Sequence, residues 1–138
     1  MVDDNPADID LTREALAQSK GHFHVSAVND GVEALLFLQR EGKYCEAPVP
    51  DMVVLDLNLP RKNGCEVLST IKADSSLARI PVVIFTSSQA SSDIARCYKL
   101  GANGYLKKPG NLPEFVAVVR SMAEFWLTFA SLPQKEKR

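Results

Sequence analysis

Features that would place this chain in a membrane or outside the cell are missing from its sequence. No apolar stretch approaches the roughly 18 residues that span a bilayer, and no secretory leader precedes the acidic start. The 16 basic and 17 acidic side chains leave a net charge of −1, which gives no electrostatic basis for binding nucleic acid or a membrane surface. We therefore expect a soluble, cytoplasmic protein with neither of these partners.

Cysteine is scarce and unpatterned. Cys45, Cys65 and Cys97 are odd in number, widely spaced and form no CxxC pair. This excludes a disulfide framework and a cysteine zinc site, and it is typical of free thiols in a reducing compartment. His22 and His24 lie two residues apart, but no third ligand type accompanies them, so we expect no metal site there.

The chain also has no internal repeat, linker or low-complexity segment, so its 138 residues predict a single domain. We expect the folded domain to cover residues 1–132. Residues 133–138, which end in KEKR, are expected to form a polar, solvated tail.

Short apolar runs that each end at a polar residue are what the sequence does contain. They read MV before Asp3 and Asp4, MVVL before Asp56, VVIF before Thr86, and GYLK before Lys108. Helix-length amphipathic stretches separate the runs, a pattern that predicts parallel strands joined by crossover helices. Because parallel strands end at one edge of a sheet, these polar side chains should gather at that edge, where α/β proteins bind ligands.

The predicted fold class is α/β, a three-layer α/β/α sandwich around a five-stranded parallel sheet of flavodoxin type, with order 2-1-3-4-5. The expected strands are Met1-Val2, 22–28, 52–55, 82–85 and 104–107, and the expected helices are 6–21, 31–40, 65–73, one ending near Leu100, and 112–130. The first strand is the anomaly, because strands average five to six residues and this one has two. We expect it to be truncated, or completed by residues ahead of Met1.

The three carboxylates predict a cation site. Asp3, Asp4 and Asp56 placed about 5 Å apart would repel one another by roughly 3 kcal/mol per pair at an effective dielectric of 20. An all-oxygen ligand set favours Mg²⁺, which also engages phosphate. With Mg²⁺ and Lys108 the charges cancel, so the site could accept a phosphoryl group, with the Thr86 hydroxyl assisting. The alternative for Asp3 and Asp4 is that they only cap the first helix.

These residues resemble the receiver domain of two-component response regulators, the CheY-like family. The matching motifs are VDD at 2–4, DLNLPRKNG at 56–64, Thr86-Ser87, and YLKKP at 105–109. The resemblance implies that Asp56 accepts a phosphoryl group from a histidine kinase and that the protein is not an enzyme. It further implies a role for each of several residues: Mg²⁺ ligands Asp3, Asp4, Asp56 and the backbone carbonyl of Asn58, a phosphoryl contact from Lys108, a conformational switch formed by Thr86 and Tyr105, and a cis peptide bond at Lys108-Pro109.

A narrower resemblance concerns the segments REGKYCEAPVPD, TSSQ–SSDI and FWLTFASLPQ, which are similar to stand-alone regulators that partner bacterial phytochromes. It implies a light-sensing kinase as phosphodonor. The enzyme alternative is a Mg²⁺-dependent phosphatase of haloacid-dehalogenase type, whose general acid two residues after the nucleophile is replaced here by Asn58. A flavin or dinucleotide carrier has little support, since no GxGxxG follows a strand.

The last predicted helix carries more apolar residues than one core stripe needs. Phe115, Val119, Met122, Trp126 and Phe129 form that stripe. A second stripe beside it, spaced by seven residues, consists of Val118, Phe125 and Leu132. Because these residues line up rather than scatter, we expect them to form a homodimer face, where the family often self-associates.

Overall fold

Three parallel strands form the regular part of the sheet in the computed structural model, which describes residues 1–19 and 21–133. They are β1 (Val53–Leu55), β2 (Val82–Thr86) and β3 (Gly104–Lys107), in the order β1-β2-β3. All five residues of β2 are buried, as expected for a central strand covered on both faces.

The first two predicted strands are reduced to single bridges. Val2 pairs in parallel with Val28 on one side and with Leu55 of β1 on the other. The lateral order is therefore 28, 2, β1, β2, β3, which is the predicted 2-1-3-4-5 order. The segment 22–28 is not a regular strand, contrary to the sequence prediction, because the described backbone partners of this segment on the first-strand side are Met1 and Asp3, at Ser26 and Val28.

Five α-helices are present among the described residues: α1 (Pro6–Ala17), α2 (Gly31–Gln39), α3 (Gly64–Ala73), α4 (Ser91–Lys99) and α5 (Leu112–Glu124). A 3₁₀ turn, η1 (Gly42–Tyr44), follows α2, and a π-helical segment, η2 (Phe125–Phe129), continues α5. The N-cap of α1 is Asn5, as predicted, and its side chain accepts hydrogen bonds from the backbone of Ala7 and Asp8. This helix ends at Ala17, earlier than the predicted end near Gly21.

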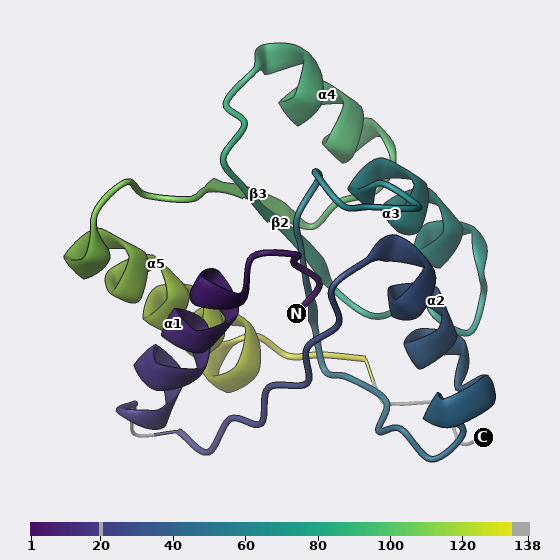
Figure 1. Cartoon of the computed structure of the whole chain (residues 1–138), viewed down its shortest axis with the longest axis horizontal. Coiled ribbons are helices and arrows are strands. Elements are labelled where there is room, and N and C mark those ends of the chain that lie inside the picture. Colours follow the sequence, from purple (N-terminus) through teal and green to yellow (C-terminus); the bar gives the residue numbers. More distant parts are fainter. Residues whose placement is uncertain (20, 134–138) are drawn as a thin grey trace.

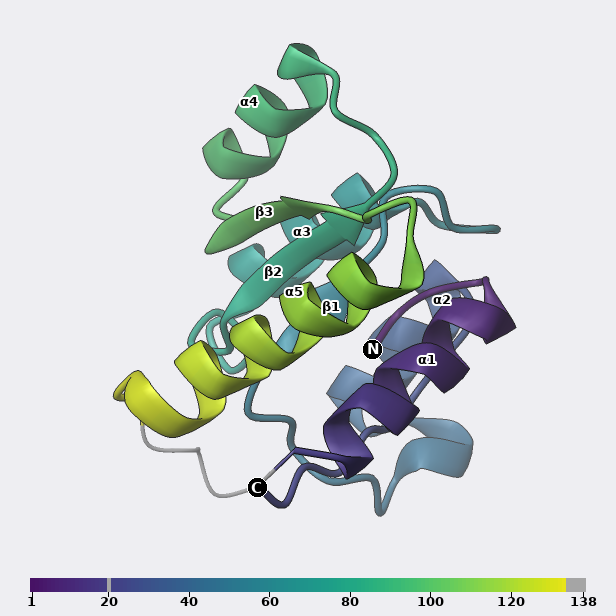
Figure 2. The same cartoon turned by 90° about the vertical axis from the view of Figure 1, so that its left-hand side faces the viewer.

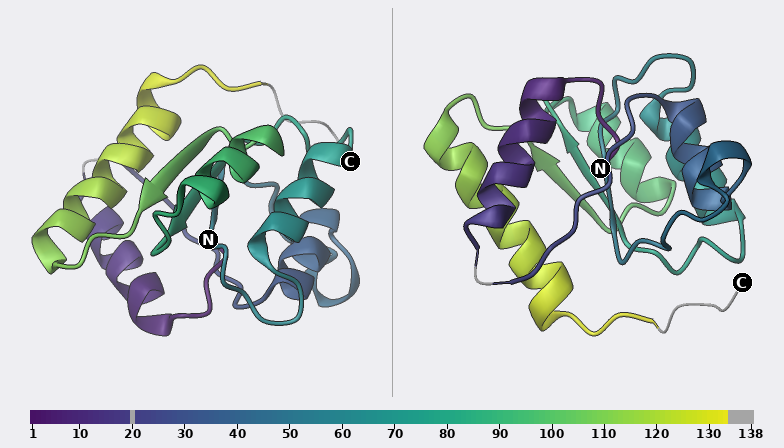
Figure 3. Two further views of the ribbon diagram at one scale, coloured as in Figure 1. Left: turned by 90° about the horizontal axis from the view of Figure 1, so that it is seen from above. Right: turned by 60° about the horizontal axis from the view of Figure 1, so that its bottom comes forward.

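The helices cover both faces of the sheet, so the molecule has the predicted three layers (Figures 1 and 2). One face packs against α2, α3 and α4, and the other packs against α1 and α5, as the view from above also shows (Figure 3). Alternation along the strands explains the division, since Val53 and Leu55 belong to the first core and Val54 contacts the second. The predicted α/β fold of flavodoxin type is confirmed.

A cavity of about 500 Å³ lies beside the first bridge. Met1, the segment 22–26, β1 and the end of the last helix line it, with Leu132 among the lining residues. The cavity lies between residues 22–26 and β1, next to the Met1 amino group.

Other expectations concern single features of the chain. The three cysteines are free, Cys45 exposed and Cys65 and Cys97 buried. Among the helices of the described residues, none is long and apolar enough to cross a membrane. The predicted tail, 133–138, lies outside the described residues except for Pro133.

Candidate functional site

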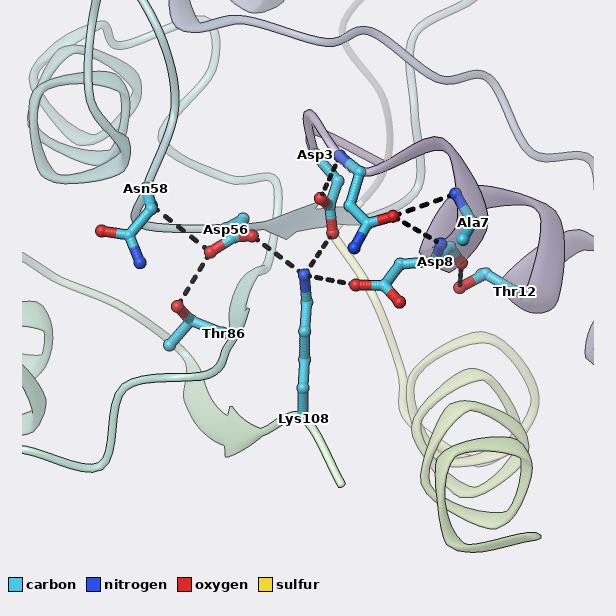
Figure 4. A network of polar contacts seen from close by, with 9 residues as sticks. Asp3, Ala7, Asp8, Thr12, Asp56, Asn58, Thr86 and Lys108 are labelled. Atoms are coloured by element: carbon cyan, nitrogen blue, oxygen red, sulfur yellow. Dashed lines mark hydrogen bonds and ion pairs between the residues drawn. The ribbon is translucent and has the colours of Figure 1, made fainter. Parts of the chain in front are cut away.

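The polar residues that follow the apolar runs meet at the carboxyl edge of the sheet (Figure 4). Asp3 follows the bridge at Val2, Asp56 follows β1, Thr86 ends β2 and Lys108 follows β3. The backbone N–H of Lys108 donates to the carbonyl of Thr86 at 2.7 Å, which extends the pairing of β2 and β3 by one residue and fixes the start of the lysine side chain.

The Lys108 ammonium is the centre of the site. Its Nζ lies 2.7 Å from Asp3 Oδ2 and 2.9 Å from Oδ2 of both Asp56 and Asp8, and its side chain is only 8% exposed. Burial alone would lower the pKa of Lys108, but the hydrogen bonds from Asp3, Asp8 and Asp56 outweigh it and raise that pKa. The lysine is therefore held as a cation.

The carboxylate of Asp56 is bound through both oxygens. Its Oδ2 accepts from Lys108, and its Oδ1 accepts a hydrogen bond of 2.8 Å from the Thr86 hydroxyl and one of 3.3 Å from the Asn58 backbone N–H. Thr86 is fully buried, so its hydroxyl has a fixed position. Asp56 is thus oriented by three donors from three different segments before any ligand arrives.

Asp3 is more deeply buried than Asp56. Its Oδ1 accepts from the backbone of Asn5 at 2.9 Å, while Oδ2 binds Lys108. Burial raises the pKa of Asp3, and the hydrogen bonds from Lys108 and Asn5 oppose that rise. Because Asn5 caps α1, Asp3 is available for the site, which answers the alternative that it only caps the helix.

An acidic cluster lies next to the ammonium. One carboxylate oxygen from each of Asp3, Asp4 and Asp56 lies within 4.8 Å of the others, and Asp4 is exposed. This donor set fits a hard divalent cation, because it offers only oxygen ligands and an open side where the ion can keep water molecules. Asn58 follows in the same loop, and the role of its carbonyl as a ligand stays a prediction.

The loop after Asp56 is held by close backbone contacts. A Cβ at Gly64 would lie 2.2 Å from the Asp56 carbonyl oxygen, so this position at the start of α3 requires glycine. On the other side of the loop, Arg61 adopts a left-handed conformation with φ of 63° and its NH2 nitrogen lies 2.7 Å from Asp30 Oδ2. Asp30 is also the N-cap of α2, where its side chain accepts a hydrogen bond from the backbone N–H of Glu33. The loop is therefore joined to that helix through Asp30.

The two predicted switch residues lie on neighbouring strands. Thr86 contacts Asp56 directly, whereas Tyr105 on β3 is half-buried and donates its hydroxyl to the carbonyl of Ser88 at 2.9 Å. Burial raises the pKa of Tyr105. Ser88 in turn donates its hydroxyl to Asp93 in the first turn of α4. The loop after β2 thus joins the site to Tyr105 and to α4.

The expected cis bond is not found. Among the described residues no peptide bond is cis, so Lys108-Pro109 is trans, the lower-energy isomer of an X–Pro bond by about 0.5–1 kcal/mol.

The predicted dimer stripe is divided among three environments. Phe125 is 57% exposed. Val118 packs against the core between α1 and α5, and Leu132 lies beyond the last helical turn, where it lines the cavity beside Met1. Phe129, assigned to the core stripe from the sequence, is instead 70% exposed.

Sequence reasoning missed Asp8, whose carboxylate contacts Lys108 at 2.9 Å. It also missed Ser88 as the partner of Tyr105. The signal for Asp8 is positional: it stands in the first turn of the helix that begins three residues after Asp3, so that turn must start at the carboxyl edge of the sheet.

Comparison with known proteins identifies the class. Residues 1–120 match the sequence family described as the response regulator receiver domain. The chain is 41% identical to response regulator Rcp1 of Synechocystis over 133 residues, which cover 96% of this chain and 90% of the relative. It is 32% identical to the polar-differentiation response regulator DivK of Brucella anthropi over 121 residues, or 88% of this chain and 91% of DivK.

Solved structures agree with the sequence matches. A crystal structure of the phosphorylated cyanobacterial phytochrome response regulator RcpA superposes with a TM-score of 0.93 at 47% identity, covering 96% of this chain and 95% of RcpA. The Mn²⁺-bound form of Rcp1 gives a TM-score of 0.92 at 41% identity, with 96% of each chain covered. The chain belongs to the response regulator receiver domain family of two-component signalling proteins.

Proposed function

We propose that this protein accepts a phosphoryl group on Asp56 from the phosphohistidine of a histidine kinase. The observation that supports this most directly is the fixed carboxylate of Asp56, held by Thr86, Asn58 and Lys108 beside two further carboxylates. In the transfer an Asp56 oxygen forms a bond to phosphorus as the N–P bond of the phosphohistidine breaks. The electron pair of the N–P bond returns to the imidazole nitrogen. The protein then acts as a signalling acceptor rather than as an enzyme with a small substrate.

A bound Mg²⁺ would be held by Asp4, Asp3 and Asp56, with the Asn58 carbonyl completing the protein ligands. The ion supplies neutralisation of the phosphoryl oxygens. Rcp1 has been crystallised with Mn²⁺, which supports a divalent cation in this family of sites. The residues of the chain do the remaining work: Lys108 provides a positive charge toward the phosphoryl group, and the Thr86 hydroxyl is within hydrogen-bonding distance of the acceptor carboxylate.

We further propose that Thr86 and Tyr105 convert phosphorylation into a change of surface. A phosphoryl group on Asp56 would place new acceptor oxygens near the Thr86 hydroxyl, so this hydroxyl would turn from the carboxylate that it now binds toward those oxygens. The loop from Thr86 to Ser88 would move with it, and Ser88 holds the Tyr105 hydroxyl. Two alternative arrangements of these contacts would give the protein two states whose populations phosphorylation shifts.

The proposed phosphodonor is a phytochrome-type histidine kinase. RcpA is a cyanobacterial phytochrome response regulator by name, and RtBRR is a bacteriophytochrome response regulator that superposes with a TM-score of 0.73 at 41% identity, covering 96% of this chain and 81% of RtBRR. This chain's high identity to both proteins along nearly its whole length supports the same class of kinase. Free thiols are typical of a reducing compartment, and we place the exchange in the cytoplasm.

The proposed assembly is a homodimer through the last helix. Phe125 is more than half exposed and lies one turn before Phe129, so the two rings give α5 and η2 an apolar outer surface near their carboxyl end. Of the other residues of the predicted stripe, Val118 packs against the core and Leu132 lines the cavity beside Met1, so the proposed surface is formed by Phe125 and Phe129.

Phosphorylation is tested by incubating the protein with acetyl phosphate and Mg²⁺ and measuring its intact mass. We expect the wild type to gain one phosphoryl mass, and peptide mapping after borohydride reduction to place it on Asp56. Asp56→Asn should gain none, because its amide is a poor nucleophile, while Asp10→Asn on the exposed side of α1 should label like the wild type. Equal labelling of Asp56→Asn at another residue would make the assignment wrong.

A further inference from the structure

We propose that Asp8 is a positioning residue for phosphotransfer: its carboxylate holds the Lys108 ammonium and restrains phosphorylation of Asp56. The inference rests on the proposed function of Asp56 and adds a residue that lies outside the strand-end motifs. Asp8 belongs to α1, and its Oδ2 lies 2.9 Å from Lys108 Nζ (Figure 4).

The backbone of Asp8 is held by hydrogen bonds at both its N–H and its carbonyl group. The N–H donates to the Asn5 side chain at 3.4 Å, and the carbonyl accepts from the Thr12 hydroxyl at 2.8 Å. The first turn of α1 starts directly after Asp3 and Asp4, so the helix presents Asp8 to the same edge of the sheet. The Asp8 side chain is 18% exposed, which leaves its contact with the lysine only partly screened by solvent.

The ammonium has no spare donor. A lysine has three N–H groups, and Lys108 has three carboxylate partners: Asp3, Asp8 and Asp56. To contact a phosphoryl oxygen, Lys108 must give up one of them. Asp56 is the phosphoacceptor and Asp3 belongs to the cation cluster, whereas Asp8 has neither role. Asp8 is therefore the partner that Lys108 exchanges for the phosphoryl group.

The charge of the site gives the direction of the effect. Asp3, Asp4, Asp8 and Asp56 against one ammonium leave a net charge of −3. A divalent cation brings this to −1, and a phosphoryl group on Asp56, which replaces −1 by about −2, brings it to −2. Without the Asp8 charge the last two values become 0 and −1. Asp8 thus disfavours the approach of an anionic phosphodonor and favours the unphosphorylated protein.

The test compares initial rates of acyl-phosphate formation from acetyl phosphate at saturating Mg²⁺. Oδ2 of Asp8 and Oδ2 of Asp56 lie at most about 6 Å apart, since each is 2.9 Å from the same nitrogen. Removing one charge at that range should accelerate phosphorylation of Asp8→Asn about three- to tenfold in a partly solvated site. Asp10→Asn removes the same charge from the exposed side of α1 and should stay within about twofold of the wild type.

Asp8→Glu separates the role of the carboxylate from a packing role, because it keeps the charge and should restore a rate within about twofold of the wild type. A second readout is independent of phosphotransfer. In metal-free urea unfolding, Asp8→Asn should destabilise the wild type but have little effect in a Lys108→Met background, since the contact is already gone there.

The outcomes are distinct. A slower or unchanged Asp8→Asn, a similarly fast Asp8→Glu, or equal unfolding effects in both backgrounds would overturn the role of Asp8 while leaving phosphorylation of Asp56 intact. If the wild type itself is not labelled, the proposed function fails, and the role of Asp8 in it falls too. The rate of Asp8→Asn is compared with that of the wild type only after circular dichroism confirms that the variant is folded. The urea unfolding measurements in the two backgrounds likewise use only variants that fold.

Discussion

We propose that Asp4 serves the cation site rather than the fold. It is exposed, yet one of its carboxylate oxygens lies within 4.8 Å of oxygens of Asp3 and Asp56. In the metal-free protein such neighbours repel one another, and the Lys108 contacts neutralise only Asp3 and Asp56 among the three. Asp4 is therefore the member of the cluster for which a bound cation would be the main compensating charge.

Replacing Asp4 with alanine should weaken Mg²⁺ binding tenfold or more, about 1.4 kcal/mol, because one of the few carboxylate ligands is lost. The thermal midpoint without metal should stay the same or rise, since a repulsive charge is removed. Isothermal titration with Mg²⁺ and calorimetric unfolding in chelator measure the two effects, with Asp10→Ala as the charge-matched control. An Mg²⁺ affinity equal to that of the wild type would refute the role of Asp4.

At the scale of residues, sequence reasoning works where the strand pattern determines position. Asp3, Asp56, Thr86 and Lys108 each end an apolar run, and parallel strands bring such ends together. Asp8 does not end a run. Its place in the site depends on how α1 is oriented over the sheet edge, which is a tertiary property, so the sequence pattern alone does not identify it.

At the scale of elements, the first strand is where the sheet is least complete. The Met1 ammonium lies 2.8 Å from the Ser26 carbonyl, where a longer strand would donate a backbone N–H. The cavity of about 500 Å³ extends from there between residues 22–26 and β1. Burial lowers the pKa of the Met1 amino group from 8.0 to about 6, because the charged form is poorly solvated in this position.

This pKa predicts a dependence of stability on pH. Between about pH 6 and 8 the unfolded chain binds a proton at Met1 that the folded protein has released, so stability should rise with pH across this range and fall on acidification. A change of two pKa units corresponds to an effect on the order of 2–3 kcal/mol. Urea unfolding at pH 6 and pH 8 measures it.

Acetylation of the amino terminus provides the matched control. The acetylated chain carries no charge at Met1, so its stability should change less between pH 6 and 8 than that of the free-amine protein. The two proteins differ only at the amino terminus, so every other contribution to the pH dependence is common to both. Equal pH dependence of the two proteins would show that the buried amino group does not contribute.

The order of elements is predictable from the sequence, whereas the regularity of some is not. The central strands and the helices follow from apolar periodicity, and the predicted lateral order is found. The segment 22–28 alternates like a strand but makes only the bridge at Val28, because a strand needs a neighbouring strand to pair with, and here only Met1 and Asp3 are seen to bond to its backbone within the described residues. The alternation of apolar residues in a segment predicts which side chains lie on each face of a sheet. It does not tell whether another strand lies beside the segment to pair with it.

At the scale of the whole molecule, the surface near the carboxyl end of the last helix is the part that the fold leaves unexplained. The sequence assigns Phe125 to an outer stripe, and its ring is exposed as that assignment requires, but Phe129 is assigned to the core and its ring is exposed as well. The reason is the π-helical turn of η2, where Ala130 N–H bonds to the Phe125 carbonyl five residues earlier, so the regular 100° spacing on which the stripes depend no longer applies.

We expect this surface to mediate the proposed homodimer. Each fully buried phenylalanine contributes roughly 1.5–3 kcal/mol, and a two-fold axis would bury the same residues twice, so Phe125 and Phe129 together could supply several kcal/mol.

Phe125→Asp should dissociate the dimer, because it would bury an unpaired charge in each half of the interface. Tyr98→Asp, an exposed aromatic on α4, is the matched control and should remain dimeric. Sedimentation velocity at tens of micromolar measures the assembly. Acetyl phosphate labelling should be retained in Phe125→Asp, since Asp56 follows the carboxyl end of β1, whereas the last helix ends near the amino end of β2 (Figure 2). A monomeric wild type, or a dimeric Phe125→Asp, would refute this interface.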